Sequence, residues 1–540
     1  MNDMQVSPHK ADPVGGLAPQ TTRVANLAHF LTRNARRLAD RPALIWQDRR
    51  WSWAQTDARV SALAAAMQDR YGITKGSRVL VQSQNCHQMF ETMFACFRLG
   101  AVWVPTNFRQ SPDEVAYLAQ SSGASLMIAG AEFPDHVAAC ASVVHHASIG
   151  GSGDDDVDTL IESYHGTPMP NAPVDRDDPC WFFFTSGTTG RPKAAVLTHG
   201  QMSYVILSHL NDLMPGSGST DVSLVVAPLS HGAGIHQLVK AAAGGATLLM
   251  PPGLFDVAEA WRLVAEHRVT DIFTVPTIVK MLVEDPAVDC YDRSSLRQVI
   301  YAGAPMYRAD QKYALERLGP VLTQYFGLGE VTGNITVLPP CDHHLDDAAM
   351  RLGSCGYERT GMQVSIQNDA GQEMAPFETG EICVCGPAVF AGYYNNPEAN
   401  AKSFRDGFFR TGDLGHLDDE GYLYITGRSS DMYISGGSNV YPREIEEKLL
   451  THPALSEVAV LGIPDPKWGE VGVAVCVARS GASVGEADVV GHLKGKVSGY
   501  KLPRQVFFFD EMPKTSYGKI TKKLILETLV ERGLVPGAAS

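Results

Sequence analysis

Residues 181–200 read WFFFTSGTTGRPKAAVLTHG, and the interpretation of the whole chain starts from this stretch. The apolar run Trp181–Phe184 predicts the end of a buried strand, and Ala194–Leu197 resumes an apolar run. Between them, residues 185–193 contain four hydroxyls, two glycines, one proline and two cations. Glycine lets a backbone approach a ligand closely, and hydroxyls and N–H groups donate to anionic oxygens. The loop therefore predicts a polyphosphate site.

The loop is not a Walker A motif, which needs adjacent Gly-Lys followed by Ser or Thr. Here Arg191 and Pro192 separate Gly190 from Lys193. The alternative is an ordinary hairpin turn rich in Ser, Thr and Gly. The combination of four hydroxyls with a terminal lysine favours phosphate binding over that alternative.

Composition narrows the class of protein. A chain of 540 residues predicts at least two domains, and 44% hydrophobic with 19% charged residues is globular composition. A formal net charge of −14 argues against nucleic-acid binding. We expect no secretory signal and no membrane-spanning segment, since no apolar run approaches about 18 residues. The ten scattered cysteines predict reduced thiols and a cytoplasmic protein.

The pattern of apolar runs predicts an α/β protein with a large multi-layer N-terminal domain and a smaller C-terminal domain. Residues 1–20 predict a disordered tail, because Pro, Gly and polar residues dominate there. Residues 21–428 alternate strand-like runs with amphipathic stretches, which predicts parallel β/α layers. Within them, the short strands and glycine turns of 351–428 predict a small antiparallel barrel. Residues 431–540 predict an α+β domain.

The stretch TSGTTGRPK resembles the signature loop of the adenylate-forming enzymes: acyl-CoA synthetases, peptide-synthetase adenylation domains and luciferases. The resemblance covers residues 25–530 almost completely, in the order that the family uses. In that family the loop holds the β- and γ-phosphates of ATP. The resemblance therefore implies these ATP-binding residues: Thr185, Ser186, Gly187, Thr188, Thr189, Gly190 and Lys193.

The stretch QYFGLGEVTG, residues 324–333, resembles the family's aromatic-Gly-x-Thr-Glu segment. The resemblance implies that Phe326 lies on adenine, with Gly327 beside it, and that Glu330 serves Mg²⁺. Phe326 replaces the usual Tyr and keeps an aromatic face. Gly329 replaces the usual Thr, which removes a hydroxyl near the α-phosphate.

The resemblance also implies that two further segments line the pockets for adenine and for the acyl group. YAGAP, residues 301–305, matches the loop beside adenine, so Gly303, Ala304 and Pro305 are expected to line the base and the acyl group. His231, in APLSHGAGIH, stands where the family places a gate near the acyl carboxylate, and we expect it in the catalytic machinery.

The resemblance also assigns residues that act on ribose and CoA. Asp413 and Arg428 are expected to hold the ribose. Gly436 and Gly437 are expected to let the pantetheine arm of CoA pass close to the backbone after the C-terminal domain, 431–540, rotates. The expected hinge is 429–430, where Ser430 replaces the usual Asp or Lys.

Lys519, in PKTSYGKITKK, matches the family's catalytic lysine, which contacts the carboxylate and the α-phosphate oxygens. Attack of a carboxylate on ATP brings two anions together, so the catalyst must neutralise charge and hold the groups in line. Cations, Mg²⁺ and backbone donors are sufficient for that task. No nucleophilic side chain is needed.

These residues together predict an AMP-forming acyl-CoA synthetase that uses a small-molecule carboxylate, ATP, Mg²⁺ and CoA. The expected pocket segments, 231–235, 299–303 and 327–334, are small and apolar and contain no arginine. They favour a medium or longer aliphatic acid or an aryl acid over acetate or a dicarboxylate. Three alternatives share the fold: an enzyme that loads a carrier protein, an oxygen-using luciferase, and a non-catalytic nucleotide sensor. Self-association as a homodimer is left open.

Overall fold

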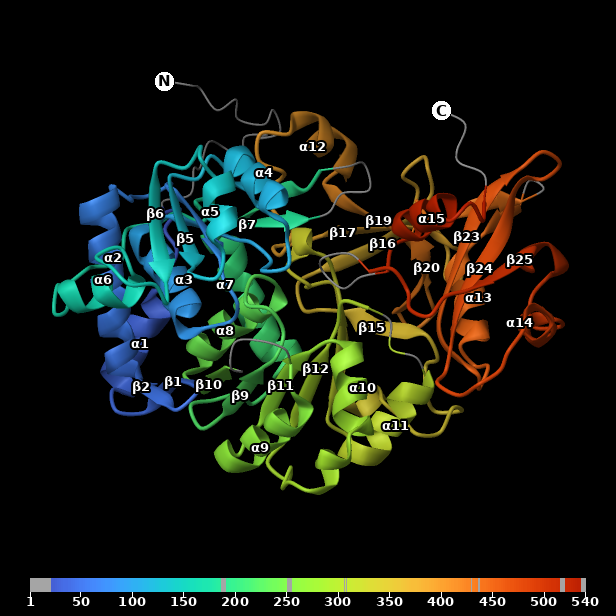
Figure 1. The fold of residues 1–540 in the computed structure, drawn as a ribbon, viewed down its shortest axis with the longest axis horizontal. Helices are drawn as coiled ribbons and strands as arrows, with labels where there is room; N and C mark the ends of the chain where they lie inside the picture. Colours follow the sequence, from blue (N-terminus) through green and yellow to red (C-terminus); the bar gives the residue numbers. More distant parts are fainter. Residues whose placement is uncertain are drawn as a thin grey trace, which may run out of the picture.

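The computed structural model describes residues 21–185, 191–249, 255–304, 306, 308–428, 430–435, 438–514 and 520–535. The predicted disordered tail, 1–20, lies outside the described residues. Among the described residues, the strands group into three sheets, and Figure 1 shows the C-terminal sheet set beside the rest of the molecule.

The first sheet has the order β6-β5-β3-β4-β7-β8. Its neighbours pair in parallel except at β7 and β8, which pair antiparallel with Thr185 opposite Lys193. The TSGTTGRPK loop thus joins the two strands of a hairpin, so a hairpin and a phosphate loop are not exclusive alternatives. The strands are β3 (Arg78–Gln82), β4 (Val102–Pro105), β5 (Leu126–Gly130), β6 (His145–Ile149), β7 (Pro179–Thr185) and β8 (Lys193–Thr198).

The second sheet has a parallel centre, as the alternating pattern predicted. Its neighbours β1-β10-β9-β11-β12-β13 all pair in parallel, and β2 closes one edge antiparallel. These strands are β1 (Pro42–Trp46), β2 (Arg49–Ser52), β9 (Val222–Val225), β10 (Ala246–Leu249), β11 (Asp271–Thr274), β12 (Gln298–Tyr301) and β13 (Leu322–Phe326).

Residues 351–428 form short antiparallel strands, but the predicted closed barrel is wrong. From β13 the sheet continues through β14, β15, β20, β19, β17 and β16, with β18 beside β19. A barrel closes only if its first and last strands pair, and in the described structure β16 stands at the end of the order. The strands are β14 (Thr336–Leu338), β15 (Ser354–Glu358), β16 (Gln363–Gln367), β17 (Gly380–Cys385), β18 (Phe404–Arg405), β19 (Phe408–Leu417) and β20 (Tyr422–Arg428).

Helices cover both sheets, and one buried apolar cluster joins them. Trp181 of the first sheet, Phe273 of the second and Leu238 of α8 belong to the same cluster. Several helices begin at a capping box that satisfies free N–H groups, as Ser52 and Gln55 do for α2. The helices are α1 (His29–Arg37), α2 (Trp53–Tyr71), α3 (His87–Leu99), α4 (Pro112–Ser122), α5 (Pro134–Ala139), α6 (Val157–Ser163), α7 (His199–Ser208), α8 (Gly232–Ala243), α9 (Val257–His267), α10 (Pro276–Glu284), α11 (Arg308–Leu318) and α12 (Pro397–Ser403), with short turns η1 (His209–Leu213), η2 (Pro286–Asp289), η3 (Gly329–Val331) and η4 (Pro340–Asp342).

The C-terminal unit builds its own sheet, in the order β22-β21-β24-β23 with β25 beside β24. Two buried clusters of its own stabilise it, one on each face. It contains β21 (Tyr433–Ser435), β22 (Ser438–Val440), β23 (Leu455–Asp465), β24 (Gly469–Ala478), β25 (Gln505–Phe508), α13 (Pro442–Leu449), α14 (Glu486–Leu493), α15 (Lys522–Glu531) and the turn η5 (Gly499–Lys501). The chain is thus α/β with a smaller C-terminal α+β domain, as predicted.

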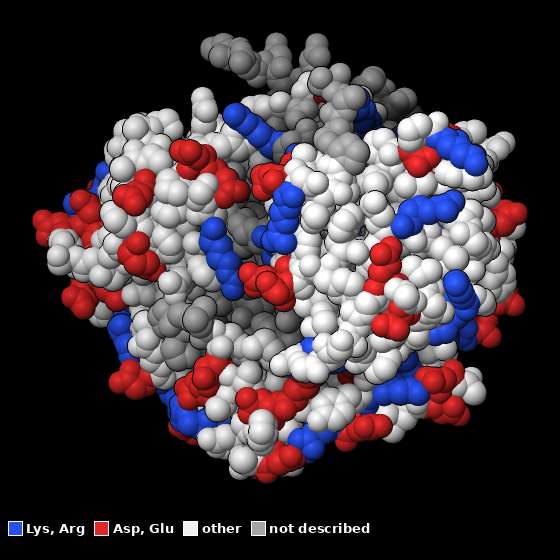
Figure 2. All heavy atoms as spheres, turned by 45° about the vertical axis from the view of Figure 1, so that its right-hand side comes forward, with Lys and Arg blue, Asp and Glu red and all other residues white. Residues whose placement is uncertain are grey.

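Charged side chains of both signs are present on the surface. On the face seen in Figure 2, basic and acidic side chains are interspersed, and both kinds stand around a hollow near its centre. Among the described residues, no helix is both long and apolar enough to cross a bilayer.

Candidate active site

The structure brings Glu330 of η3 against the first residue of the TSGTTGRPK loop. Thr185 Oγ1 donates to Glu330 Oε1 at 2.7 Å, and the Tyr393 hydroxyl donates to the same oxygen at 2.9 Å. Glu330 is 7% exposed. Burial and the neighbouring carboxylate of Glu330 raise the pKa of Tyr393, so its hydroxyl keeps the proton that it donates. Two motifs that are far apart in sequence therefore form one site.

Lys193 belongs to the same site. It is the first residue of β8, opposite Thr185 in the hairpin, and its Nζ lies 5.1 Å from the centroid of the Tyr393 ring. A cation over an aromatic face is held electrostatically. The predicted phosphate-loop residues between the two strands (Ser186, Gly187, Thr188, Thr189 and Gly190) lie outside the described residues.

The predicted adenine residues follow two neighbouring parallel strands. Gly303 and Ala304 follow β12 after one intervening residue, and Phe326 ends β13, with Gly327 next. In open α/β sheets, ligands bind at the carboxyl ends of the strands. Gly303 has φ +87°, which favours glycine, and Ala304 is exposed. Pro305 lies outside the described residues.

Asp413 and Arg428 meet across two antiparallel strands. They are register partners of β19 and β20, and Arg428 Nε lies 3.0 Å from Asp413 Oδ1. Burial raises the pKa of Asp413, while Arg428 opposes the shift. A buried carboxylate held by one guanidinium can still accept from hydroxyls such as those of a ribose.

His231 is the residue just before α8 and lies against β7. Its ring is 4.7 Å from that of Phe183, at an interplanar angle of 64°. Since Phe183 is two residues before Thr185, the predicted gate histidine lies at the same end of β7 as the phosphate loop. His236, one turn into α8, is fully buried and bonded to Ser223 and Asp271 instead.

Three further predicted site residues come from the C-terminal part of the chain. Lys519, Gly436 and Gly437 lie outside the described residues, as does position 429 of the predicted hinge. The neighbouring β21 and β22 are described, and they form a hairpin whose strands end at Ser435 and begin again at Ser438.

Sequence reasoning missed several residues that touch the site. Tyr393 bonds Glu330, Phe183 touches His231, and Phe273 and Tyr325 lie at the start of α8. In the sequence, Phe183 and Phe273 are ordinary apolar strand residues. Only the packing of their strands against α8 and η3 shows that they lie at the site.

Glu330 fits the expected magnesium ion by its chemistry. A carboxylate oxygen is a ligand that Mg²⁺ prefers, and the ion is usually bound by one or two carboxylates together with substrate phosphates. The hydroxyls of Thr185 and Tyr393 orient the carboxylate through Oε1. Because a carboxylate has a second oxygen, Glu330 can accept both these bonds and a metal.

The described residues contain one other group with metal-ligand chemistry: His87, Glu91 and Asp158. There, the guanidinium of Arg59 bonds both Glu91 and Asp158. A cation that belongs to the protein therefore already neutralises these carboxylates. This group is explained as a buried ion-pair cluster.

Two family models match the chain. The AMP-binding enzyme model matches residues 31–394, and the AMP-binding enzyme C-terminal domain model matches residues 444–519. The chain therefore belongs to the family of AMP-binding, adenylate-forming enzymes. Within this family it is an AMP-forming acid–CoA ligase, as its relatives indicate.

Among the relatives, the chain is 36% identical to a feruloyl-CoA synthase from Amycolatopsis sp, over 87% of this chain and 92% of the relative. It is 34% identical to the long-chain-fatty-acid–CoA ligase FadD13 of Mycobacterium tuberculosis, over 89% and 93%. Among solved structures, it is similar to o-succinylbenzoate CoA synthetase from Bacillus subtilis in complex with the acyl-adenylate intermediate OSB-AMP. That match has a TM-score of 0.81 and 30% identity over 92% of this chain and 97% of the other.

Proposed function

We propose that this enzyme activates a compact aryl carboxylic acid to its acyl-adenylate and transfers the acyl group to CoA, with release of AMP and pyrophosphate. The observation that carries the choice of acid is an aromatic wall at the start of α8. A β-carbon added to Gly232 would lie 3.2 and 3.3 Å from the Phe273 ring and 3.6 Å from the Tyr325 hydroxyl. Gly232 directly follows His231, the residue expected at the acyl carboxylate. The aromatic wall is therefore next to the expected position of that carboxylate.

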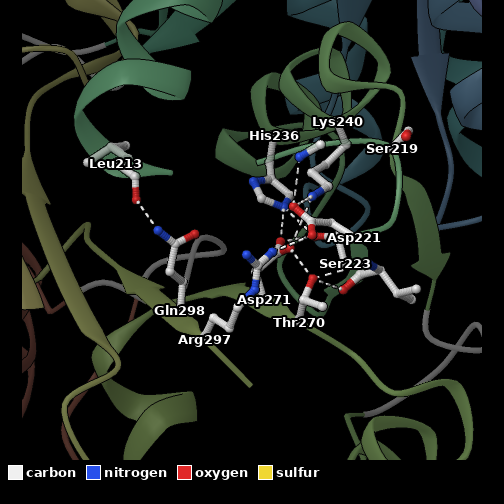
Figure 3. Close-up of polar contacts among 12 residues, drawn as sticks. Leu213, Ser219, Asp221, Ser223, His236, Lys240, Thr270, Asp271, Arg297 and Gln298 are labelled. Atoms are coloured by element: carbon white, nitrogen blue, oxygen red, sulfur yellow. Dashed lines mark hydrogen bonds and ion pairs between the residues drawn. The ribbon is translucent and has the colours of Figure 1, made fainter. Parts of the chain in front are cut away.

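The Phe273 ring cannot move away from Gly232, because a buried network of charged side chains packs against it. Its ring stacks on His236 at 4.9 Å and 29°. Figure 3 shows His236 and Lys240 pointing at Asp271, whose oxygens lie 3.2 Å from His236 Nε2 and 3.1 Å from Lys240 Nζ. Burial alone would raise the pKa of Asp271, but Lys240 and His236 lower it below the ordinary range.

A second buried network backs Tyr325. Its ring lies 6.3 Å from that of His209, and His209 Nδ1 is 3.1 Å from the fully buried Arg359. Arg359 also lies 3.5 Å from Asp212. Breaking a buried ion pair costs about 3–5 kcal/mol, so neither network can open for a chain to pass.

The wall therefore favours a flat ring over a long chain. Aromatic side chains stack on or pack edge-on to an aryl ring at 4.5–7 Å, roughly, and gain more than contact area alone. Arg359 is paired with Asp212, so this guanidinium is already neutralised by a carboxylate of the protein. The aliphatic alternative is retained as a second candidate because the FadD13 relative, named for long-chain fatty acids, is nearly as similar as the feruloyl-CoA synthase.

In this proposal the chain's own groups hold and orient the substrates. Thr185–Lys193 holds the β- and γ-phosphates, Phe326 stacks on adenine, and Asp413 with Arg428 accepts and orients the ribose. Glu330 holds Mg²⁺, which, when bound, neutralises phosphate charge.

The remaining groups act on the acid and the thiol. His231 lies at the acyl carboxylate, and Lys519 neutralises the charge that develops between carboxylate and α-phosphate. Gly436 and Gly437 let the pantetheine arm approach the backbone in the second step.

The test is acid-dependent AMP release with cinnamate, benzoate, hexanoate, dodecanoate and succinate, each with ATP, Mg²⁺ and CoA. We expect kcat/KM for cinnamate or benzoate to exceed that for dodecanoate by about tenfold or more, a discrimination of the size that pocket shape supplies. Phe273→Ala should raise the dodecanoate value, while the matched control Phe273→Leu should not. A wild-type preference for dodecanoate would refute the aryl assignment, and ADP in place of AMP would refute the reaction itself.

The acceptor of the acyl group, the oligomeric state and the location in the cell stay predictions. Replacing CoA with a carrier protein in the same assay tests the carrier-loading alternative. The elution mass of the purified protein tests a homodimer, and fractionation of the source cells tests the cytoplasmic location.

A further inference from the structure

Aromatic rings form a continuous ladder from the first sheet to His231. Trp103 of β4 lies 4.7 Å from Trp181 of β7, Trp181 lies 5.7 Å from Phe183, and Phe183 lies 4.7 Å from His231. Both tryptophans are fully buried, and Phe183 is 5% exposed. Rings in such a ladder have little freedom to move, because interiors are close-packed.

The alternation of β7 explains why the ladder ends at the active site. Trp181, Phe183 and Thr185 are two residues apart, so their side chains lie on the same face of the strand. Thr185 bonds Glu330, and Phe183 touches His231. One strand face therefore orients both the expected metal ligand and the expected gate.

Gly329 also lies against the Phe183 ring. A β-carbon at 329 would be 2.5 Å from Phe183 Cδ1, 2.6 Å from Cε1 and 2.7 Å from Thr185 Cγ2. Carbon atoms in good contact are about 3.5–4.0 Å apart, so no side chain fits at 329 while Phe183 keeps its place. The glycine that departs from the family pattern is thus explained by the ring that occupies the space.

We propose that Phe183 is a positioning residue that sets the place of His231, and that position 329 is glycine because this ring needs its volume. The proposal rests on the proposed function, since His231 acts there on the acyl carboxylate. It assigns a role to an apolar strand residue and a cause to the missing threonine.

The first experiment is a double-mutant cycle of Phe183→Val and His231→Ala, with kcat and KM measured for acid-dependent AMP release. Valine removes the ring atoms Cδ1 and Cε1 but keeps a strand-forming residue. We expect Phe183→Val to lower kcat/KM for the acid about tenfold, in line with the effect of small misplacements, and to leave KM for ATP within about twofold. In the His231→Ala background the same change should cost less than about twofold.

Equal losses in both backgrounds would overturn the proposal, because Phe183 would then act independently of His231. An equal rise in KM for ATP and acid would also overturn it, since that pattern indicates general damage. Melting temperatures of all variants identify those that fail to fold.

The second experiment pairs Gly329→Ala with Phe183→Val and needs no activity. Alanine at 329 should lower the melting temperature when Phe183 is present. It should lower the melting temperature less in the Phe183→Val background, where the two contacts with the ring are gone and the close contact with Thr185 Cγ2 is what remains. Equal lowering in both would refute the explanation of Gly329. If the wild type releases no AMP with any acid, the proposed function fails, while this thermal cycle still decides the packing claim.

Discussion

Replacing Tyr433 should separate the two half-reactions of this enzyme. The Tyr433 side chain lies lengthwise across Gly462 and Gly472, which are register partners on β23 and β24. A β-carbon on Gly462 would be 2.3 Å from Tyr433 Cβ, and one on Gly472 would be 2.1 Å from the hydroxyl oxygen. The absence of side chains at the two glycines thus leaves the space that this ring occupies, and Tyr433 is 2% exposed.

The magnitude follows from the contacts that hold the β21–β22 hairpin to its sheet. Besides Tyr433, they include the pairing of Ser435 with Gly469 and a 2.8 Å bond from Ile434 N to Glu470 Oε2. Truncating a buried aromatic ring to alanine costs about 3–5 kcal/mol. If about half of that loss falls on the hairpin, about 2 kcal/mol lowers the ratio of ordered to detached hairpin roughly thirtyfold, at 1.4 kcal/mol per factor of ten in an equilibrium constant.

The assay measures the steps separately. Adenylation is followed as acid-dependent pyrophosphate release with hydroxylamine and no CoA, and thioester formation is followed as CoA consumption. For Tyr433→Ala we expect thioester formation to fall about tenfold or more, since the loop between β21 and β22 is the proposed CoA side, while adenylation stays within about twofold.

Tyr433→Phe is the matched control. It keeps the ring and removes a hydroxyl that has no hydrogen-bond partner among the described residues, so both half-reactions should stay near wild type. Gly472→Ala should act like Tyr433→Ala, because the added methyl group displaces the ring at an overpacking cost of about 1–3 kcal/mol. Parallel losses of both half-reactions would refute the reasoning, because they would indicate unfolding of the C-terminal domain rather than release of the hairpin.

Three further predictions concern the adenylation site. Lys519→Ala should abolish AMP release but retain ATP binding, measured by calorimetry, and full activity would contradict its role. Glu330→Gln should raise the Mg²⁺ concentration needed for half-maximal AMP release, and chelation by EDTA should stop wild-type turnover. Because burial raises the pKa of Asp413, its carboxylate takes a proton at a higher pH than an ordinary Asp does. The affinity for ATP should therefore fall as the pH is lowered through that raised pKa, and Asp413→Asn, already weaker, should show no such fall in a calorimetric titration.

Much of the fold was predictable because its signals are local. The amphipathic spacing of VAEAWRLVAEH, residues 257–267, is enough to indicate α9, and the apolar runs RVLVQS (78–83) and DIFTVP (271–276) are enough to indicate β3 and β11. The predicted barrel failed because closure depends on which strands pair, and the strands of 351–428 have the same short, turn-rich pattern whether they close or extend a sheet. Local pattern does not contain that information.

The sequence by itself determined the family and predicted the phosphate loop, because hydroxyls, glycines and a lysine at fixed spacing have the same chemistry wherever the chain places them. Only the tertiary structure decided what surrounds that loop. Glu330 meets Thr185 across 145 residues. Phe183, which reads as one more apolar strand residue, meets Gly329 and His231 through strand alternation and sheet order. The sequence shows only that position 329 lacks the usual threonine. The tertiary structure shows that the ring of Phe183 occupies the space that a side chain there would need.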